Sequence, residues 1–135
     1  MTTIKDLSNL KGRRALITGA TGCLGKVMSA TLAELGADLV FVDRLGSDFD
    51  SLSSSITEQW GVKVEYRICD LEQQEQRTEL MSWLKNGNQG LNIIINNAAF
   101  VGTSGLKGWG VPFEEQSIGT WRRALEVNLT ATFDH

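Results

Sequence analysis

A short apolar run that breaks into three evenly spaced glycines constrains the fold of this chain more than any other feature. Residues 15–17 predict a buried strand, and apolar residues from Leu24 to Leu35 recur at the spacing of a helix. The glycines at 19, 22 and 25 lie between the two. Glycine leaves room for a ligand beside the backbone, and a helix that begins after such a turn points free N–H groups at it. The stretch therefore predicts a phosphate-binding turn.

The spacing of these glycines can be compared with that of known phosphate-binding motifs. It reads G-x-x-G-x-x-G, whereas the general dinucleotide motif is G-x-G-x-x-G. It also departs from the ATP-type loop G-x-x-x-x-G-K-[ST], because Ala20 stands where the first glycine belongs and Val27 where a hydroxyl would bind Mg²⁺. A P-loop NTPase is therefore disfavoured. A tight strand–helix connection without a ligand stays open as the alternative.

Length and composition favour one globular domain with a small-molecule ligand. The chain has 135 residues, 41% of them hydrophobic, and a net charge of −3 without a basic run. Nucleic acid and anionic membranes are therefore not expected partners. No apolar run approaches the ~20 residues of a membrane span, and the N-terminus lacks the apolar core of a signal peptide. We expect a cytoplasmic protein without a metal site, since the single histidine, His135, has no metal-ligating neighbour.

The rest of the chain alternates between predicted strands and helices. Strands are expected at 39–42, 62–68 and 91–95, the second of them at an edge because its pattern is half polar. Gly36 and Gly61 are placed as helix stops, and Ser117 as the cap of a last helix. Asp70 and Gln73 have the spacing of a capping box. The order βαβαβαβα predicts a parallel sheet with right-handed crossovers between two helical layers.

Polar or glycine-rich residues follow the carboxyl ends of all four predicted strands. They are the turn at 19–25, Asp43, Asp70 and residues 96–99. Parallel sheets bind ligands beyond these ends, where the strand order reverses. Four such stretches on one edge favour a cofactor site over a mere connection.

The same stretches resemble the short-chain dehydrogenase/reductase family. They read T-G-A-T-G-C-L-G at 18–25, C-D-L at 69–71, N-N-A-A at 96–99 and V-N-L at 127–129. The usual branch has T-G-x-x-x-G-x-G, so Cys23 occupies the place of its middle glycine, and Ala99 replaces the last glycine of N-N-A-G. The resemblance implies a Rossmann-like α/β/α domain with strand order 3-2-1-4 and a slightly altered pyrophosphate turn.

The resemblance also implies which residues bind the cofactor. Asp70 and Leu71 would flank the adenine, and Asn97, Ala98 and Ala99 would line the ribose beside the glycine turn. Simpler alternatives remain open: a helix cap for Asp70, a plain turn for Asn97, and a small packing residue for Cys23. The residues expected to wrap the pyrophosphate and adenosine ribose are Gly19, Thr21, Gly22, Cys23, Leu24 and Gly25.

Asp43 decides the expected cofactor. It lies 24 residues after Gly19, near the ~20 expected of the acid that binds the ribose hydroxyls. A carboxylate there would repel the 2′-phosphate of NADP, although Arg44 could pair with that phosphate. We therefore expect NAD rather than NADP. A solvated turn acid is the alternative for Asp43.

The catalytic part of the family pattern is mostly missing from these residues. The resemblance implies that Asn128 supports a water in the proton relay, and a polar residue that faces another helix is the alternative. The family's serine and Y-x-x-x-K pair do not occur after it, and Asp70 rather than lysine stands four residues after the single tyrosine, Tyr66. We expect residues 1–135 to be the NAD-binding portion of an oxidoreductase acting on a hydroxyl or carbonyl group, inactive by itself. A non-catalytic dinucleotide-binding or scaffold protein is the alternative.

The sequence gives less information about the substrate and the oligomeric state. The loop 102–113, with Lys107, Trp109 and Phe113, would line one wall of the substrate pocket. The strand at 91–95 would lack a neighbour on one side, so we expect the chain by itself to associate or aggregate. The whole enzyme is expected to be a homo-oligomer acting on a small molecule.

Overall fold

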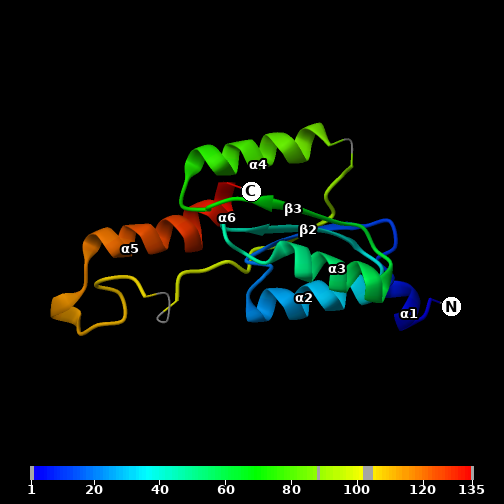
Figure 1. Cartoon of the computed structure of the whole chain (residues 1–135), viewed down its shortest axis with the longest axis horizontal. Coiled ribbons are helices and arrows are strands. Elements are labelled where there is room, and N and C mark those ends of the chain that lie inside the picture. Colours follow the sequence, from blue (N-terminus) through cyan, green and yellow to red (C-terminus); the bar gives the residue numbers. More distant parts are fainter. Residues whose placement is uncertain (1, 88, 102–104, 135) are drawn as a thin grey trace.

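A computed structural model describes residues 2–87, 89–101 and 105–134 and shows a parallel sheet covered by helices on both faces (Figure 1). Four strands pair in the order β3-β2-β1-β4, which confirms the predicted order. The strands are β1 Arg14–Thr18, β2 Asp38–Asp43, β3 Val64–Ile68 and β4 Ile93–Ile95. The helical elements are α1 Ile4–Leu7, α2 Cys23–Glu34, α3 Phe49–Trp60, α4 Gln74–Asn86, the 3-10 turn η1 Phe113–Glu115, α5 Ile118–Leu125, the π-helical segment η2 Glu126–Thr130 and α6 Ala131–Asp134.

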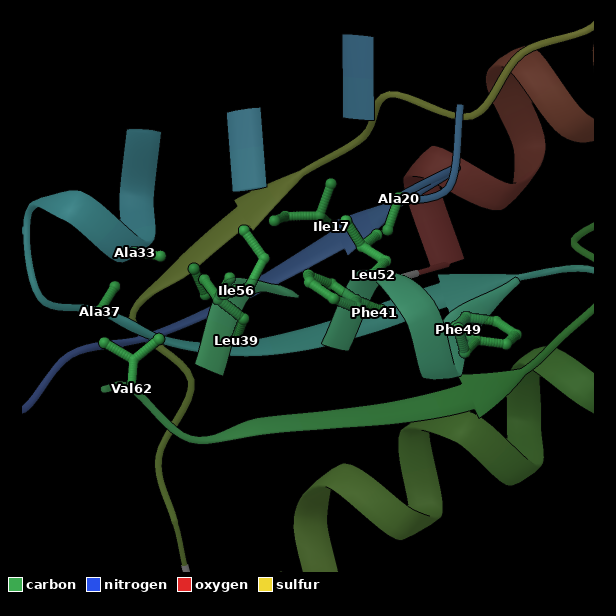
Figure 2. Close-up of a cluster of buried hydrophobic side chains, with 11 residues drawn as sticks. Ile17, Ala20, Ala33, Ala37, Leu39, Phe41, Phe49, Leu52, Ile56 and Val62 are labelled. Atoms are coloured by element: carbon green, nitrogen blue, oxygen red, sulfur yellow. The ribbon is translucent and has the colours of Figure 1, made fainter. Parts of the chain in front are cut away.

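The two central strands are apolar on both faces, and this divides the core into two clusters. Every residue of β1 is buried, as are the four inner residues of β2. Alternate side chains point to opposite faces of a strand, so Ile17 and Phe41 pack under α2 and α3, as Figure 2 shows, whereas Leu16 and Val40 pack under α4 and η2. Full burial of such a side chain contributes about 1.5–3 kcal/mol to folding. The three-layer α/β/α prediction is confirmed.

The strand register brings the carboxyl ends of the strands to one level. Thr18 pairs with Val42, Asp43 with Ile68, and β4 ends at Ile95 opposite Ile17. The N–H of Gly19 then donates to the carbonyl of Val42 at 2.8 Å. The glycine turn therefore begins beside the end of β2.

Several helix limits follow the sequence as predicted. Gly36 and Gly61 have φ of 96° and 68°, in the left-handed region that favours glycine at a helix end. The Ser117 side chain caps α5 by accepting a hydrogen bond from the Thr120 N–H. The prediction of a capping box at Asp70 is wrong, because α4 begins only at Gln74 and its N-cap is Gln73. A turn, closed by a 2.9 Å bond from the Gln73 N–H to the Asp70 carbonyl, precedes the helix.

The last helix differs from the expected regular one. Its middle is the π-helical segment η2, which carries Val127 and Asn128. Figure 1 shows α5 reaching away from the sheet. Ala124, Val127 and Ala131 pack in the core, whereas a stripe of large apolar residues along the same helix is exposed. We call this stripe the outer apolar face; its residues are Ile118, Trp121, Leu125, Leu129 and Phe133.

Within the described ranges, none of the helices combines the length and the apolar character needed to cross a membrane.

Candidate cofactor-binding site

A cavity of about 640 Å³ opens at the carboxyl ends of the strands. It lies between the glycine turn, the end of β2, the segment after β3 and the segment after β4. Gly25 and Asn128, which the sequence also assigned to the site, fall outside the described lining. The lining residues are Gly19, Thr21, Gly22, Cys23, Leu24, Val42, Asp43, Arg44, Ser47, Cys69, Asp70, Leu71, Asn97, Ala98, Ala99, Phe100, Val101 and Val127.

The glycine turn is shaped by close backbone contacts. Gly19 has φ of +63°, and a Cβ on it would meet Ala98 Cα at 3.0 Å. A Cβ on Gly25 would lie 2.2 Å from the carbonyl oxygen of Gly19, so only glycine lets α2 approach the turn. Gly22 is the N-cap of α2, and the first helical residues line the cavity. The positive end of the helix dipole thus faces a space that an anionic group can enter.

Asp43 is held in place at the cavity. One carboxylate oxygen accepts the Thr21 N–H at 3.0 Å and the Thr21 hydroxyl at 2.6 Å. The other accepts the Arg44 N–H at 2.9 Å. A carboxylate offers about four acceptor sites, so capacity remains for a ligand hydroxyl. Asp43 is half-buried and positioned rather than a freely solvated turn residue.

The segment after β3 forms a second wall of the cavity, made by Asp70 and Leu71. The Asp70 carboxylate accepts the Glu72 N–H at 3.0 Å, and the Gln76 side chain accepts the Asp70 N–H at 2.7 Å. Gln76 thus plays the reciprocal part that the capping-box prediction gave to Gln73. Leu71 is buried, and its carbonyl accepts a hydrogen bond from Arg77.

Asn97 fixes the third wall to the glycine turn. Its side-chain amide donates to the carbonyls of Thr18 and Gly19 at 3.0 and 3.1 Å. The Thr18 hydroxyl accepts the N–H groups of Asn97 and Ala98, each at 3.0 Å. These bonds join the end of β4 to the end of β1. Asn97 therefore shapes the cavity in addition to lining it.

Asn128 joins η2 to the segment after β4. Its side chain accepts the Phe100 N–H at 2.8 Å and donates to the Phe100 carbonyl at 3.0 Å. π-helical turns are frequent at functional sites. This contact holds Phe100 at the cavity, while the proton-relay role of Asn128 stays a prediction.

Several lining residues were not selected as site residues from the sequence. Val42, Phe100 and Val127 each adjoin a residue that was named, so the motifs could have been extended by one position to include them. Ser47 comes from the loop after β2 and has no such signal.

Of the loop at 102–113 that was predicted to line the substrate pocket, residues 102–104 lie outside the described residues. Trp109 packs against Trp121 on α5, at 6.4 Å between ring centroids.

The described residues contain no group of three or more His, Cys, Asp or Glu placed to hold a metal ion.

The two cysteines are expected to differ in reactivity. Cys23 is exposed at the cavity, which contradicts the packing interpretation, and Cys69 is buried. Burial, together with the charge of Asp70, raises the pKa of the Cys69 thiol to about 11. At pH 8, iodoacetamide should therefore modify Cys23 and spare Cys69, which remains a thiol. ADP should slow the modification of Cys23, as mass spectrometry can follow. Unchanged labelling at saturating ADP would contradict a ligand at the turn.

The parallel sheet, the glycine turn and the cavity beyond the strand ends define a Rossmann-like nucleotide-binding fold. Residues 13–135 match the family described as short chain dehydrogenase, and the chain belongs to that family. This membership does not favour the alternative of a non-catalytic scaffold.

Similar proteins include sugar-alcohol dehydrogenases. Galactitol 2-dehydrogenase of Rhizobium johnstonii is 30% identical over 124 residues, which make up 92% of this chain and 45% of that enzyme. A solved NAD⁺-bound xylitol dehydrogenase has a TM-score of 0.78 and 23% identity, over 93% of this chain and 45% of its own. A Sphingobium yanoikuyae short-chain dehydrogenase in complex with NADPH has a TM-score of 0.77 and 27% identity, over 90% of this chain and 45% of its own. The chain spans about half the length of the curated relatives it matches.

Proposed function

We propose that this chain is the NAD-binding portion of an oxidoreductase that acts on a hydroxyl or carbonyl group of a small molecule. The observation that carries the proposal is the positioned carboxylate of Asp43 beside a glycine turn into which side chains do not fit. NAD, when bound, supplies the hydride acceptor. The turn at 19–25 would hold its pyrophosphate, Asp43 its adenosine ribose, and Asp70 and Leu71 its adenine.

The same geometry supports NAD over NADP. Asp43 keeps acceptor capacity for a ribose hydroxyl, and its charge opposes a 2′-phosphate. Arg44 also lines the cavity, and its backbone N–H donates to Asp43. Among similar solved structures, one holds NAD⁺ and another holds NADPH. The choice of NAD therefore rests on Asp43.

Comparative titration of NAD⁺ and NADP⁺ tests this function. We expect NAD⁺ to bind at least about tenfold more tightly, as one hydrogen bond to a charged group predicts. Asp43→Asn should remove most of that preference. Glu58→Gln, which neutralises an exposed carboxylate on α3 outside the cavity, should leave it unchanged. Tighter binding of NADP⁺ by the wild-type chain would refute the choice of NAD.

The 135-residue polypeptide by itself is expected to show no turnover. Its one tyrosine, Tyr66, lies on the edge strand β3, stacks on Phe49 at 4.7 Å and donates to Asp50 at 3.2 Å. The hydrogen bond to Asp50 raises the pKa of Tyr66. General acid–base help from a positioned group contributes about 10²–10⁴-fold. Formation of NADH from NAD⁺ and a panel of alcohols, followed by absorbance, would contradict this expectation if it exceeded the protein-free rate.

The two cysteines are free thiols, which supports a reducing compartment such as the cytoplasm. A homo-oligomeric whole enzyme is also part of the proposal.

A further inference from the structure

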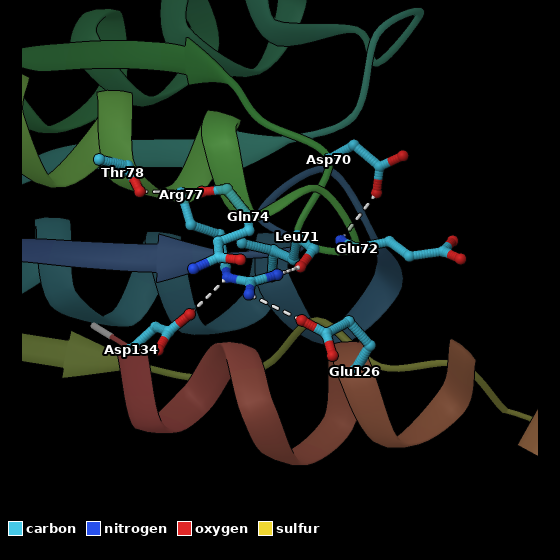
Figure 3. Close-up of polar contacts among 8 residues, drawn as sticks. All are labelled: Asp70, Leu71, Glu72, Gln74, Arg77, Thr78, Glu126 and Asp134. Atoms are coloured by element: carbon cyan, nitrogen blue, oxygen red, sulfur yellow. Dashed lines mark hydrogen bonds and ion pairs between the residues drawn. The ribbon is translucent and has the colours of Figure 1, made fainter. Parts of the chain in front are cut away.

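One buried cation joins three segments around the second wall of the cavity. Arg77, on α4, is only 3% exposed. Its guanidinium donates to the Leu71 carbonyl, to the Glu126 carboxylate at 2.7 Å and to the Asp134 carboxylate at 2.8 Å. Figure 3 shows these bonds spreading from Arg77 to the turn before α4 and to the last helix. A single side chain thus ties α4 and this turn to η2 and α6.

The first part of α4 fixes the backbone of two consecutive lining residues. Gln76 accepts the Asp70 N–H at 2.7 Å, and Arg77 donates to the carbonyl of the next residue, Leu71. Glu72 in the same turn is tied to α5 by two bonds from Arg123, at 2.6 and 3.0 Å. The wall at 70–71 is therefore held by side chains and by the turn bond from the Gln73 N–H to the Asp70 carbonyl, rather than by strand pairing.

A charged residue at position 77 is a costly way to stabilise a fold. Removing a guanidinium from water costs free energy, and well-packed apolar side chains often stabilise a core as well as a buried ion pair does. The planar fork of arginine can, however, donate to a carbonyl and two carboxylates at once. Burial by itself would lower the pKa of Arg77, but the hydrogen bonds to Glu126 and Asp134 outweigh it and raise the pKa.

We propose that Arg77 is a positioning residue that fixes the wall at Asp70 and Leu71 for the adenine of the cofactor. The inference rests on the proposed function, which places adenine at this wall. Glu126 directly precedes Val127, and Val127 lines the same cavity. By donating to the Leu71 carbonyl, Arg77 fixes the wall before a ligand arrives, and Glu126 and Asp134 balance its charge.

Two matched variants separate positioning from general stability. Glu126→Gln with Asp134→Asn removes both negative charges but keeps a side-chain oxygen at each position that can accept from Arg77, which still donates to Leu71. Adding Arg77→Met to this pair also removes that donor, without leaving a buried unpaired charge. The probes are ADP, which carries adenine, and inorganic pyrophosphate, which reaches only the glycine turn. Both are titrated by calorimetry well below the melting temperature of each variant.

We expect ADP affinity to fall about tenfold in the triple variant, the loss expected when one ordinary hydrogen bond no longer fixes the wall. The double variant should bind ADP as the wild type does, and pyrophosphate should bind all three equally. Arg77→Lys serves as a second variant if the triple variant does not fold. Its ammonium lacks the fork, so the same selective loss is expected.

The outcomes distinguish the two proposals. An equal loss of ADP affinity in the double and triple variants, a loss that extends to pyrophosphate, or full ADP affinity without the Arg77 guanidinium would overturn the positioning role. A wild-type chain that binds neither ADP nor pyrophosphate would overturn the proposed function and this inference with it.

Discussion

Gly25→Ala is expected to lower the free energy of unfolding by about 3 kcal/mol and to remove detectable binding of ADP. The added Cβ would lie 2.2 Å from the Gly19 carbonyl oxygen and 2.7 Å from Ala20 Cα. Both are backbone atoms, so no side chain can turn aside to make room. Helix α2 would have to move away from the turn, and the N–H groups at its start would move with it. Urea unfolding followed by circular dichroism measures the first effect, and calorimetry the second.

Gly90→Ala provides the matched control for this substitution. A Cβ at Gly90 meets nothing within 4 Å, and the residue is exposed. Its effect on the unfolding free energy should therefore stay within about 0.5 kcal/mol, the range of ordinary surface substitutions. If Gly25→Ala proved equally mild, the close approach of α2 to the turn would not be a requirement of the fold.

The 135-residue polypeptide is expected to self-associate when made alone. The outer apolar face exposes Phe133 by 88% and Leu129 by 64%, and on β4, an edge of the described sheet, Ile94 is 44% exposed. Contiguous apolar surface and an open strand edge both favour association. Light scattering at increasing concentration should report species larger than the monomer.

Charged substitutions test which surface drives this association. Leu129→Glu with Phe133→Lys should shift the population strongly toward monomer, because each places a charge in the outer apolar face. Ile4→Glu changes an equally exposed apolar residue on α1, far from that face in sequence, and should have little effect. A wild-type chain that stays monomeric and unfolds cooperatively would show that these surfaces do not drive association.

Hydrophobic patterning was sufficient to predict the sheet and the helices that cover its two faces. The apolar runs of β1 and β2 have the doubly buried pattern of central parallel strands, and glycine at 36 and 61 marked helix ends. The motifs after the strands predicted most of the cavity lining, because the carboxyl ends of parallel strands meet at one edge. These features depend on residues close together in the sequence.

The features that were missed depend on contacts between distant residues. Arg77 in a polar helix looks like a solvated charge, and only the tertiary fold brings Glu126 and Asp134, 49 and 57 residues away, to it. The π-helical turn at η2 disrupts a helical period that the apolar stripe suggested was continuous. The turn at Asp70 replaced the capping box because Gln76, rather than Gln73, reaches its N–H.

An NMR titration of the isotope-labelled chain with NAD⁺ can locate the cofactor site, because shifts of the amide signals report where the ligand binds. We expect saturable shifts of the amide signals of the glycine turn at 19–24, of Asp43 and Arg44, and of Asp70 and Leu71. NADP⁺ should produce the same shifts only at higher concentration. The amides of Gly90 and Asn92, which line a separate cavity at the amino ends of the strands, should not move. Shifts confined to that cavity, or none at millimolar NAD⁺, would contradict the assignment of the cofactor site.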